Sequence, residues 1–392
     1  MSVFAGLVGQ EAVVAQLQAA ADDAGRLTAG GSGGPGGMTH AWLFTGPPGS
    51  GRSVAARAFA AALQCEQAGC GECLACQQAR SGSHPDVAVV VPEGLHLVKA
   101  EALEIIARSS RAPTRGRWQV TLIEDADRLE ERTSNILLKA IEEPPPRGVL
   151  LLCAPSVEDL LPTIRSRCRL VSLRTPPDEA VARVLIERDG VDPAMAAFAA
   201  RAAQGHIGRA RRLATDEQAR QERREVLALP MSLRTVASTL TAAAALVDAA
   251  KAEAALLTTG RDVAERASLA LAFGEGATGK GVTAAKRGSA TALKELEKRQ
   301  KSRATRTQRD ALDRALNDLA AFYRDVLAQQ LGAAVHAVHS DLGTQASTLA
   351  RSSRAEETLR RVEAVLACRQ ALDRNVAPLL AVEAMALALR TG

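Results

Sequence analysis

The stretch AWLFTGPPGSGRS, residues 41–53, places a short apolar run directly before a glycine-rich loop. The next residues, VAARAFAAALQ, repeat apolar side chains with helical periodicity. A strand, a glycine loop and a helix in this order form the context of the phosphate-binding motif G-x-x-x-x-G-K-[ST]. One position departs from the motif, because Arg52 stands where the motif has lysine. We therefore predict a phosphate loop at the end of a strand, with an altered cation.

Most of this loop keeps the features that hold a phosphate. Its backbone N–H groups can face an anion at the positive end of the following helix. Ser53 retains the hydroxyl that such loops use to bind Mg²⁺. Arg52 keeps the positive charge, but its longer planar head fits poorly between two phosphates. The candidate nucleotide-contacting residues of the loop are Gly46, Gly49, Ser50, Gly51, Arg52 and Ser53.

Apolar runs and helical stretches alternate on either side of this loop. The runs lie at 87–91, 118–123 and 149–154, and the helical stretches lie at 99–109 and 133–142. Such alternation predicts a parallel sheet with helices on both faces. Near the start of the chain, a helix is expected over residues 10–24. A flexible glycine-rich insertion, GRLTAGGSGGPGGM, is expected to follow it.

Two acidic residues, Glu124 and Asp125, follow the run that ends at residue 123. A nucleotide site needs carboxylates at a strand end, one to hold Mg²⁺ and one to orient the attacking water. The usual order is Asp then Glu, and here the order is reversed. Asp125 is one methylene short for the second task, and a misplacement of about 1 Å costs on the order of 100-fold in rate. The alternative interpretation is an exposed acidic turn.

Four of the seven cysteines lie close together, at Cys65, Cys70, Cys73 and Cys76. Their C-x4-C-x2-C-x2-C spacing allows four thiolates to bind one tetrahedral Zn²⁺. All four positions would then be occupied by cysteine, so we predict a structural zinc site at 65–76 with no open position for catalysis. The alternatives are free or disulfide-bonded cysteines, and a redox pair is less favoured because the C-x2-C steps overlap.

Composition bounds the architecture and the location of the chain. With 392 residues, the chain is long enough for two or three domains, and its 2% aromatic content leaves Ala, Leu and Val to form the cores. The sequence turns almost wholly helical after Leu173, which predicts a small helical domain at 176–220 and a larger one at 221–392. The fold class is therefore α/β plus all-α. The N-terminus has no signal-peptide pattern, so a cytoplasmic protein is expected.

A basic segment at 276–309 is the main concentration of charge in a chain whose net charge is only +5. After a Gly/Thr/Ala loop it reads KELEKRQKSRATRTQR, with seven cations and two glutamates. This pattern allows a phosphate-contacting surface. A solvated helix is an equally good interpretation, because no aromatic residues are interleaved with the cations.

Several motifs together resemble the bacterial clamp-loader family of AAA+ proteins over about residues 1–220. The motifs are TGPPGSGRS (45–53), the cysteine cluster, SHPD (83–86), IEDADRL (123–129), NILLKAIEEPP (135–145) and TIRSRCRL (163–170). The resemblance implies an AAA+ domain at 1–175, a helical lid at 176–220 and a helical collar at 221–392. It also implies a place in the five-subunit clamp loader of DNA polymerase III. The implied partners are the tau/gamma and delta subunits, the sliding clamp and primed DNA.

The resemblance assigns a role to one arginine. Members of the family place ATP between subunits and take an arginine from the neighbouring subunit. In this chain the Ser-Arg-Cys motif falls at Ser166, Arg167 and Cys168, so Arg167 is the candidate arginine finger. A guanidinium there can neutralise charge on the transferred phosphoryl group. Without the resemblance, a basic loop before a strand would be the preferred interpretation.

Two more departures accompany Arg52 and the reversed Glu124–Asp125 pair. Pro155 occupies the place of a polar residue, and Gly208 occupies the place of a nucleotide-sensing arginine unless the neighbouring Arg209 fills it. Together they predict a subunit that does not hydrolyse ATP, with ATP or ADP binding still possible. The alternatives are an active tau/gamma-type ATPase and a stand-alone zinc-dependent DNA-binding protein.

Overall fold

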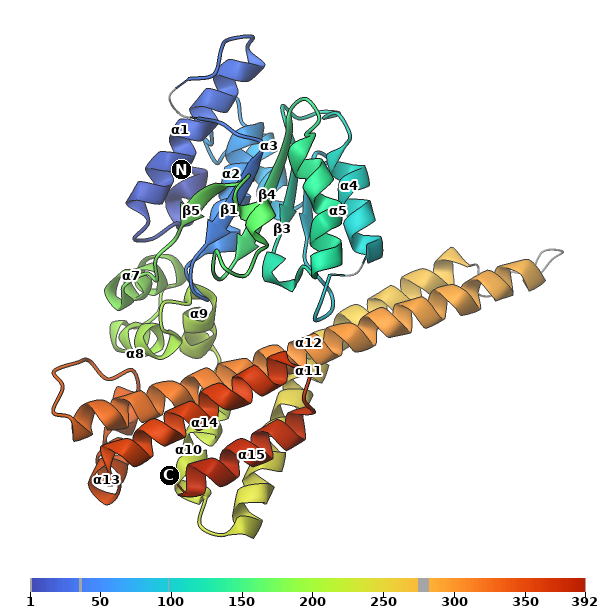
Figure 1. Cartoon of the computed structure of the whole chain (residues 1–392). Coiled ribbons are helices and arrows are strands. Elements are labelled where there is room, and N and C mark those ends of the chain that lie inside the picture. Colours follow the sequence, from blue (N-terminus) through green and yellow to red (C-terminus); the bar gives the residue numbers. More distant parts are fainter. Residues whose placement is uncertain (1, 35–36, 98, 274–281, 392) are drawn as a thin grey trace. The chain divides into compact units, whose positions relative to one another are not determined.

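The computed structural model describes residues 2–34, 37–97, 99–273 and 282–391 (Figure 1). The chain forms two compact units. Unit 1 consists of Met1–Pro92 and His96–Thr215, and unit 2 consists of Glu93–Leu95 and Asp216–Gly392. Within the described ranges, no helix combines the length and the apolar character needed to span a bilayer. Part of the predicted basic segment, residues 276–281, lies outside the described residues.

Unit 1 is built on a five-stranded parallel sheet. Its strands are β1 (Ala41–Thr45), β2 (Val87–Val90), β3 (Gln119–Ile123), β4 (Gly148–Ala154) and β5 (Arg169–Ser172). Their order in the sheet is β2-β3-β4-β1-β5. β1 lies between β4 and β5, and its Leu43 pairs with Leu152 of β4 and with Leu170 of β5. The parallel sheet with the glycine-rich loop after β1, together with the helices that follow β5, confirms the predicted α/β plus all-α fold class.

Helices cover both faces of this sheet, as predicted. They are η1 (Val3–Gly6), α1 (Glu11–Thr28), α2 (Arg52–Gln64), α3 (Leu74–Ser81), α4 (Lys99–Ser109), η2 (Ala126–Arg128), α5 (Glu131–Glu142) and α6 (Pro162–Arg165). On one face, Trp42 packs edge-on against Phe59 of α2, with 4.9 Å between the ring centroids. On the other face, Leu43 joins a core with Ile105 of α4 and Leu137 of α5. The alternating side chains of β1 therefore contribute to two cores.

The predicted end of the first helix is wrong. We expected the helix to end at residue 24 before the glycine-rich run, but α1 continues to Thr28. The buried Asp23 accepts hydrogen bonds from the Arg26 side chain and from the backbone N–H groups of Gly34 and Met38. These contacts tie the start and the end of the run to α1, so tertiary contacts outweigh the low helix propensity of Gly25.

Unit 1 ends in three short helices, α7 (Asp178–Asp189), α8 (Pro193–Ala203) and α9 (Ile207–Thr215). Gly190 closes α7 in the left-handed conformation, with φ of 65°. Asp192 caps the next helix by accepting hydrogen bonds from the N–H groups of Ala194 and Met195. These caps fix the turn between α7 and α8.

Unit 2 contains helices and no strand among its described residues. Its elements are α10 (Glu217–Ser232), α11 (Val236–Ala272), α12 (Val282–Gln330), η3 (Ser340–Leu342), α13 (Gly343–Ser352), α14 (Ala355–Asp373) and α15 (Pro378–Thr391). α11 and α12 form a long hairpin, and the other helices of the unit pack at one end of it (Figure 1). The core at that end includes Leu316, Phe322, Val365 and Val382. The other end of the hairpin extends beyond these helices.

Candidate nucleotide and metal sites

Helix α2 connects the two candidate sites of unit 1. Its first residue is Arg52, at the end of the phosphate loop, and its last is Gln64, directly before Cys65. The helix is rich in alanine and is buried from Ala58 to Gln64, and its 13 residues separate the two sites. The sequence predicted both sites and the helix between them.

The backbone of the phosphate loop depends on its glycines. Gly46, Gly49 and Gly51 have φ angles of 150°, 90° and 89°, which side-chain-bearing residues adopt rarely. A Cβ atom at Gly49 would also lie 2.7 Å from the Cα atom of His206, at the start of α9. The loop and the first residues before α9 therefore approach each other too closely for a side chain.

A cavity of about 310 Å³ adjoins the loop. Its lining includes Leu7, Val8, Pro48, Gly49, Ser50, Gly51, Arg52, Ser53, Asp125, Pro176, His206, Ile207 and Gly208. The Ser50 hydroxyl is buried and has no hydrogen-bond partner among the residues that the structure describes. An unpaired hydroxyl beside helix-end N–H groups suits a phosphate oxygen, so the loop fits the phosphate part of a nucleotide.

Arg52 lines this cavity but is engaged by its own loop. One guanidinium N–H donates a hydrogen bond to the carbonyl oxygen of Gly46. A lysine ammonium would reach forward as a compact charge, whereas the planar guanidinium folds back onto the first glycine of the loop. The cation that would neutralise the phosphates, Arg52, is therefore already hydrogen-bonded to the backbone of its own loop.

The two acidic residues after β3 have separate environments. Glu124 forms an ion pair with Arg57 of α2, with 2.8 Å between Oε1 and Nε. Asp125 lines the cavity and has a left-handed backbone with φ of 51°. The structure thus brings Asp125 to the phosphate loop, while the carboxylate of Glu124 is neutralised by Arg57. Sequence reasoning missed Arg57, although it is the only charged residue after Arg52 in an otherwise apolar helix.

The other two altered positions also lie at the loop. Pro155 contacts the loop through its backbone: its carbonyl oxygen accepts a hydrogen bond from the N–H of Gly46 at 3.1 Å. Gly208 lines the cavity, and Arg209 is not among the lining residues. The ring of His206 accepts a hydrogen bond from the N–H of Arg209 and caps α9. Neither position offers a polar side chain to a bound phosphate.

The four cysteine sulfurs converge at the other end of α2. The ligand atoms of Cys65, Cys70, Cys73 and Cys76 all lie within 4.8 Å of one another. The Cys65 sulfur is 3.6 Å from that of Cys70 and 3.7 Å from that of Cys73. Four sulfurs at 2.3 Å from a tetrahedral zinc are about 3.8 Å apart. The observed separations match metal coordination and are far longer than the S–S bond of a disulfide. All seven cysteines are free.

Backbone N–H groups point at these sulfurs. The N–H groups of Cys70, Cys73 and Cys76 each face the sulfur of the preceding cysteine at 3.4 Å. Donation from the N–H groups of Glu72 and Cys73 lowers the pKa of Cys70 to about 6. Burial instead raises the pKa of Cys73 and Cys76. A bound cation would offset that cost, since a coordinating thiol is deprotonated. The cluster fits a metal ion.

Arg167 lies apart from both sites, on the exposed turn between α6 and β5. Its guanidinium is 2.9 Å from a carboxylate oxygen of Glu142 and donates to the carbonyl oxygen of Thr163, also at 2.9 Å. The side chain is 42% exposed. Cys168, the next residue, is partly buried, and desolvation raises the pKa of its thiol to about 12. The turn is anchored at Cys168 and presents Arg167 at the surface.

Comparison with known proteins finds similarity between this chain and subunits of DNA polymerase III. Residues 34–177 match the family described as DNA polymerase III, delta subunit. The chain is 31% identical over 195 residues to DNA polymerase III subunit delta' of Bacillus subtilis, covering 49% of this chain and 59% of that protein. It is 33% identical over 196 residues to the gamma/tau subunit of Mycobacterium tuberculosis, covering 48% of this chain and 32% of that protein. The chain thus spans between a third and three fifths of these relatives.

A solved structure matches over a longer part of the chain. A DNA polymerase III gamma subunit-related protein from Thermotoga maritima is similar over 89% of this chain and 93% of its own. The sequence identity is 14% and the TM-score is 0.39.

Proposed function

Because residues 34–177 match the family described as DNA polymerase III, delta subunit, we propose that the chain is a clamp-loader protein and, more closely, the delta-prime subunit of the DNA polymerase III clamp loader. In this role it helps to load the sliding clamp on primed DNA during replication. It would act in a heteropentamer with tau/gamma and delta subunits. Residues 176–220 would serve as the lid of the AAA+ domain, and residues 221–392 as the collar that holds the ring.

We propose that this subunit does not hydrolyse ATP. The observation that carries the proposal is the engagement of its catalytic positions by the chain itself. Arg52 donates to the carbonyl of Gly46, and Glu124 is paired with Arg57. Electrostatic stabilisation of phosphoryl transfer requires these groups to face the phosphates. The cavity and its unpaired Ser50 hydroxyl still allow ATP or ADP to bind without turnover.

Arg167 is the proposed arginine finger for a neighbouring subunit. Its exposure and its place on a turn allow the guanidinium to reach a phosphate held by another chain. There it would neutralise charge that develops on the transferred phosphoryl group. In the isolated chain the same guanidinium is held by Glu142 at 2.9 Å, which keeps the side chain ordered at the surface. The exchange of a carboxylate for a phosphate needs only a side-chain movement.

Cys65, Cys70, Cys73 and Cys76 would hold a structural zinc ion. When bound, zinc would cross-link the loop between α2 and α3 through four sulfurs and leave no open position for catalysis. The backbone of the loop already favours this arrangement in the metal-free chain, because its N–H groups donate to the cysteine sulfurs and so stabilise thiolates. The zinc site therefore supports the fold of unit 1.

The test is reconstitution of the full chain with the tau/gamma and delta subunits of the same source. Arg167→Ala should abolish ATP turnover at the neighbouring site, with a loss on the order of 1000-fold at that site. Arg165→Ala, which removes the arginine at the end of α6, is the matched control and should leave turnover unchanged. Assembly of the ring is checked by sedimentation for each variant. Normal turnover in an assembled Arg167→Ala ring would disprove the finger assignment.

One observation favours a second candidate, an active tau/gamma-type ATPase. Ser53 and Asp125 both line the cavity, so a hydroxyl and a carboxylate of the kinds that bind Mg²⁺ lie beside the phosphate loop. The similarity to the gamma/tau subunit of Mycobacterium tuberculosis is also as high as the similarity to the delta' subunit of Bacillus subtilis. ATP turnover by the purified chain that is lost in Ser53→Ala would select this candidate. Absence of such turnover selects the delta-prime role.

A further inference from the structure

The start of α9 lies against the phosphate loop. The two segments meet at Gly49, where a Cβ atom would lie 2.7 Å from the Cα atom and 2.8 Å from the Cβ atom of His206. His206, Ile207 and Gly208 line the same cavity as the phosphate loop. The residues that begin α2 and the residues that begin α9 therefore border one space, although they are distant in the sequence.

The N-terminus of α9 offers hydrogen-bond donors to this space. Ile207 and Gly208 are the first two residues of the helix, and the first N–H groups of a helix have no acceptor within it. Within the part of the chain that the structure describes, neither N–H group donates a hydrogen bond. Like the N-terminus of α2, this helix end carries a partial positive charge that favours an anion.

A buried polar group in the same cavity independently indicates a ligand. Ser50 is only 2% exposed, and its hydroxyl finds no hydrogen-bond partner among the described residues. A buried hydroxyl without a partner is unfavourable unless a ligand or a water molecule bonds to it. The cavity thus combines two helix N-termini with an unsatisfied hydroxyl, and this set of donors suits an anion with more than one charged group.

The imidazole ring of His206 has a defined orientation at this helix end. Its Nδ1 accepts a hydrogen bond from the backbone N–H of Arg209 at 3.2 Å. In a neutral imidazole that accepts at one nitrogen, the other nitrogen carries the proton. Nε2 of His206 is therefore the donor of a side chain that lines the cavity.

Capping of α9 does not by itself explain a histidine at this position. Ser, Thr, Asp and Asn are the residues that cap helices best, and Asp192 has this role for α8. An aspartate beside the cavity would repel an anion. A histidine caps the helix through Nδ1 and keeps an N–H group at Nε2, so it serves both purposes.

Gly208 leaves room for the ring of His206. A Cβ atom at Gly208 would lie 3.3 Å from Cε1 and 3.5 Å from Nδ1 of that ring. A side chain at position 208 would therefore compete with the imidazole for space. Gly208 is not among the glycines with a positive φ angle, so the backbone itself does not require a glycine here. The histidine and the glycine form one arrangement, which occupies the place where the clamp-loader resemblance expects an arginine.

We propose that His206 and the first N–H groups of α9 bind a second phosphate of a nucleoside diphosphate or triphosphate, in place of the arginine that is absent at position 208. The phosphate loop binds one phosphate, and α9 binds the neighbouring one. A nucleoside monophosphate has no second phosphate and does not engage His206. This inference rests on the proposed binding of nucleotide without turnover, and it adds the residues that recognise the ligand.

The test measures binding of N-methylanthraniloyl-ADP to the full chain by fluorescence anisotropy. His206→Ser keeps a capping oxygen on α9 but removes the imidazole. It should weaken binding about 10-fold, as expected for the loss of one hydrogen bond to a charged group. Binding of the corresponding AMP analogue should stay unchanged. The matched control is His96→Ser, which removes an exposed histidine outside the cavity lining and should bind both analogues as the wild type does.

A reciprocal exchange tests whether the imidazole replaces the arginine. Gly208→Arg alone should not tighten binding, because the ring of His206 lies where the new side chain would begin. The double variant His206→Ser, Gly208→Arg should bind the ADP analogue as tightly as the wild type. Circular dichroism checks that each variant is folded. If His206→Ser does not fold, His206→Asn supplies another capping side chain for the same comparison.

Three outcomes overturn the proposal. They are unchanged binding of the ADP analogue by folded His206→Ser, equal weakening for the ADP and AMP analogues, and a double variant that binds no better than His206→Ser. A wild-type chain that binds no nucleotide also overturns it, but leaves the role in the ring to be decided by Arg167→Ala. Conversely, normal turnover in the Arg167→Ala ring disproves the arginine finger and leaves the binding result for His206 intact.

Discussion

The two ends of α2 carry two sequence motifs that differ in their readiness for a ligand. At the C-terminal end, four cysteine sulfurs point at one another with separations that suit a tetrahedral metal. At the N-terminal end, the phosphate loop keeps its glycine geometry, but Arg52 and Glu124 are engaged by neighbouring groups of the same chain. A motif can therefore keep its backbone shape while its charged side chains bond to other groups of the same chain instead of facing a ligand.

The largest effect is expected at the cysteine end. Cys73→Ser removes one of four ligands and should lower the unfolding midpoint of the chain by more than about 10 °C, because metal binding is coupled to folding. Zinc content by mass spectrometry should fall from one equivalent to a small fraction. Cys168→Ser is the control, since its sulfur lies outside the cluster, and it should retain one equivalent of zinc. Wild-type protein that purifies without bound metal would contradict the prediction.

Asp86 tests how the cysteine end of α2 is supported. Its buried carboxylate accepts hydrogen bonds from the N–H groups of Thr114, Arg115 and Gly116. The adjacent Arg117 donates its N–H to Gln64, the last residue of α2. Asp86→Asn removes the charge and should lower the free energy of unfolding by about 2 kcal/mol at neutral pH. Urea unfolding measures the loss, and an unchanged midpoint would contradict the proposed support.

The same carboxylate gives a pH dependence. Burial acts to raise the pKa of Asp86, but the three N–H donors outweigh it and lower the pKa from 3.8 to about 2. A lowered pKa stabilises the fold above pH 4, and this contribution of about 2 kcal/mol is lost as the pH falls from about 4 to about 2. The stability difference between wild type and Asp86→Asn should shrink over that range. A difference that stays constant down to pH 2 would contradict the assignment.

A smaller effect is expected at the phosphate-loop end. Arg52→Lys restores a compact ammonium and should tighten binding of a fluorescent ATP analogue by about 10-fold, the worth of one charged hydrogen bond. Turnover should stay absent, because Glu124 remains paired with Arg57 and Pro155 still offers no side-chain hydrogen bond. Arg52→Gln is the control and should not tighten binding. Measurable ATP hydrolysis by Arg52→Lys alone would show that Arg52 is the sole defect.

The smallest effect concerns a helix with no ligand motif. Gly260→Ala in α11 should raise the free energy of unfolding by about 0.5 to 1 kcal/mol, since alanine is the better helix former and its Cβ would meet open space. Denaturant unfolding measures this gain. The matched control is Gly49→Ala, which must destabilise, because its Cβ would collide with the backbone of His206.

Much of unit 1 was predictable, because strands, loop and helix follow one another in the sequence with clear periodicity. The strands at residues 41–45 and 119–123 lie within predicted runs, and the cysteine spacing indicated a cluster that the structure brings together. The direction of the Arg52 guanidinium was not predictable. It depends on a carbonyl oxygen that the folded loop positions, and the loop conformation follows from three glycines.

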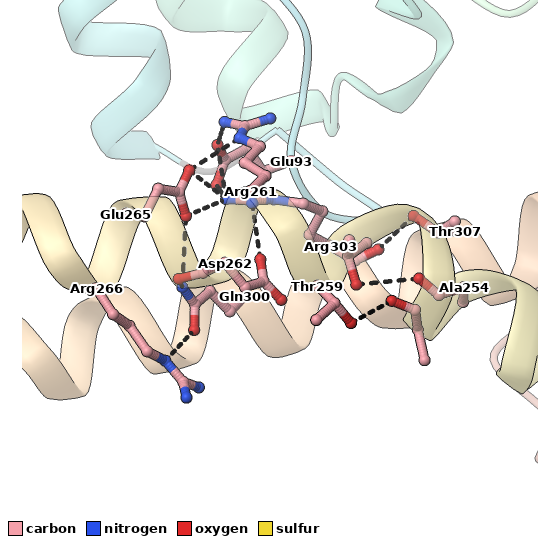
Figure 2. A network of polar contacts seen from close by, with 12 residues as sticks. Glu93, Ala254, Thr259, Arg261, Asp262, Glu265, Arg266, Gln300, Arg303 and Thr307 are labelled. Carbon is pink, nitrogen blue, oxygen red and sulfur yellow. Dashed lines mark hydrogen bonds and ion pairs between the residues drawn. The ribbon is translucent and has the colours of Figure 1, made fainter.

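The remaining differences come from contacts between residues distant in sequence. Arg57 and Glu124 are 67 positions apart, and only the packing of α2 beside β3 makes them partners. The extension of α1 depends on hydrogen bonds between Asp23 and the glycine-rich run. In the α11–α12 hairpin, Arg303 pairs with Asp262 and Glu265, which are 41 and 38 positions away (Figure 2). Local propensity and periodicity carry no information about such pairings.

The most direct test of the central claim compares Ser53→Ala and Arg167→Ala in the same reconstituted clamp loader. Ser53 serves the chain's own cavity, whereas Arg167 would serve a neighbour. DNA-stimulated ATP turnover should be unchanged by Ser53→Ala and should lose the contribution of one site with Arg167→Ala. The opposite result, a loss with Ser53→Ala and normal turnover with Arg167→Ala, would contradict the account and assign ATP hydrolysis to this chain.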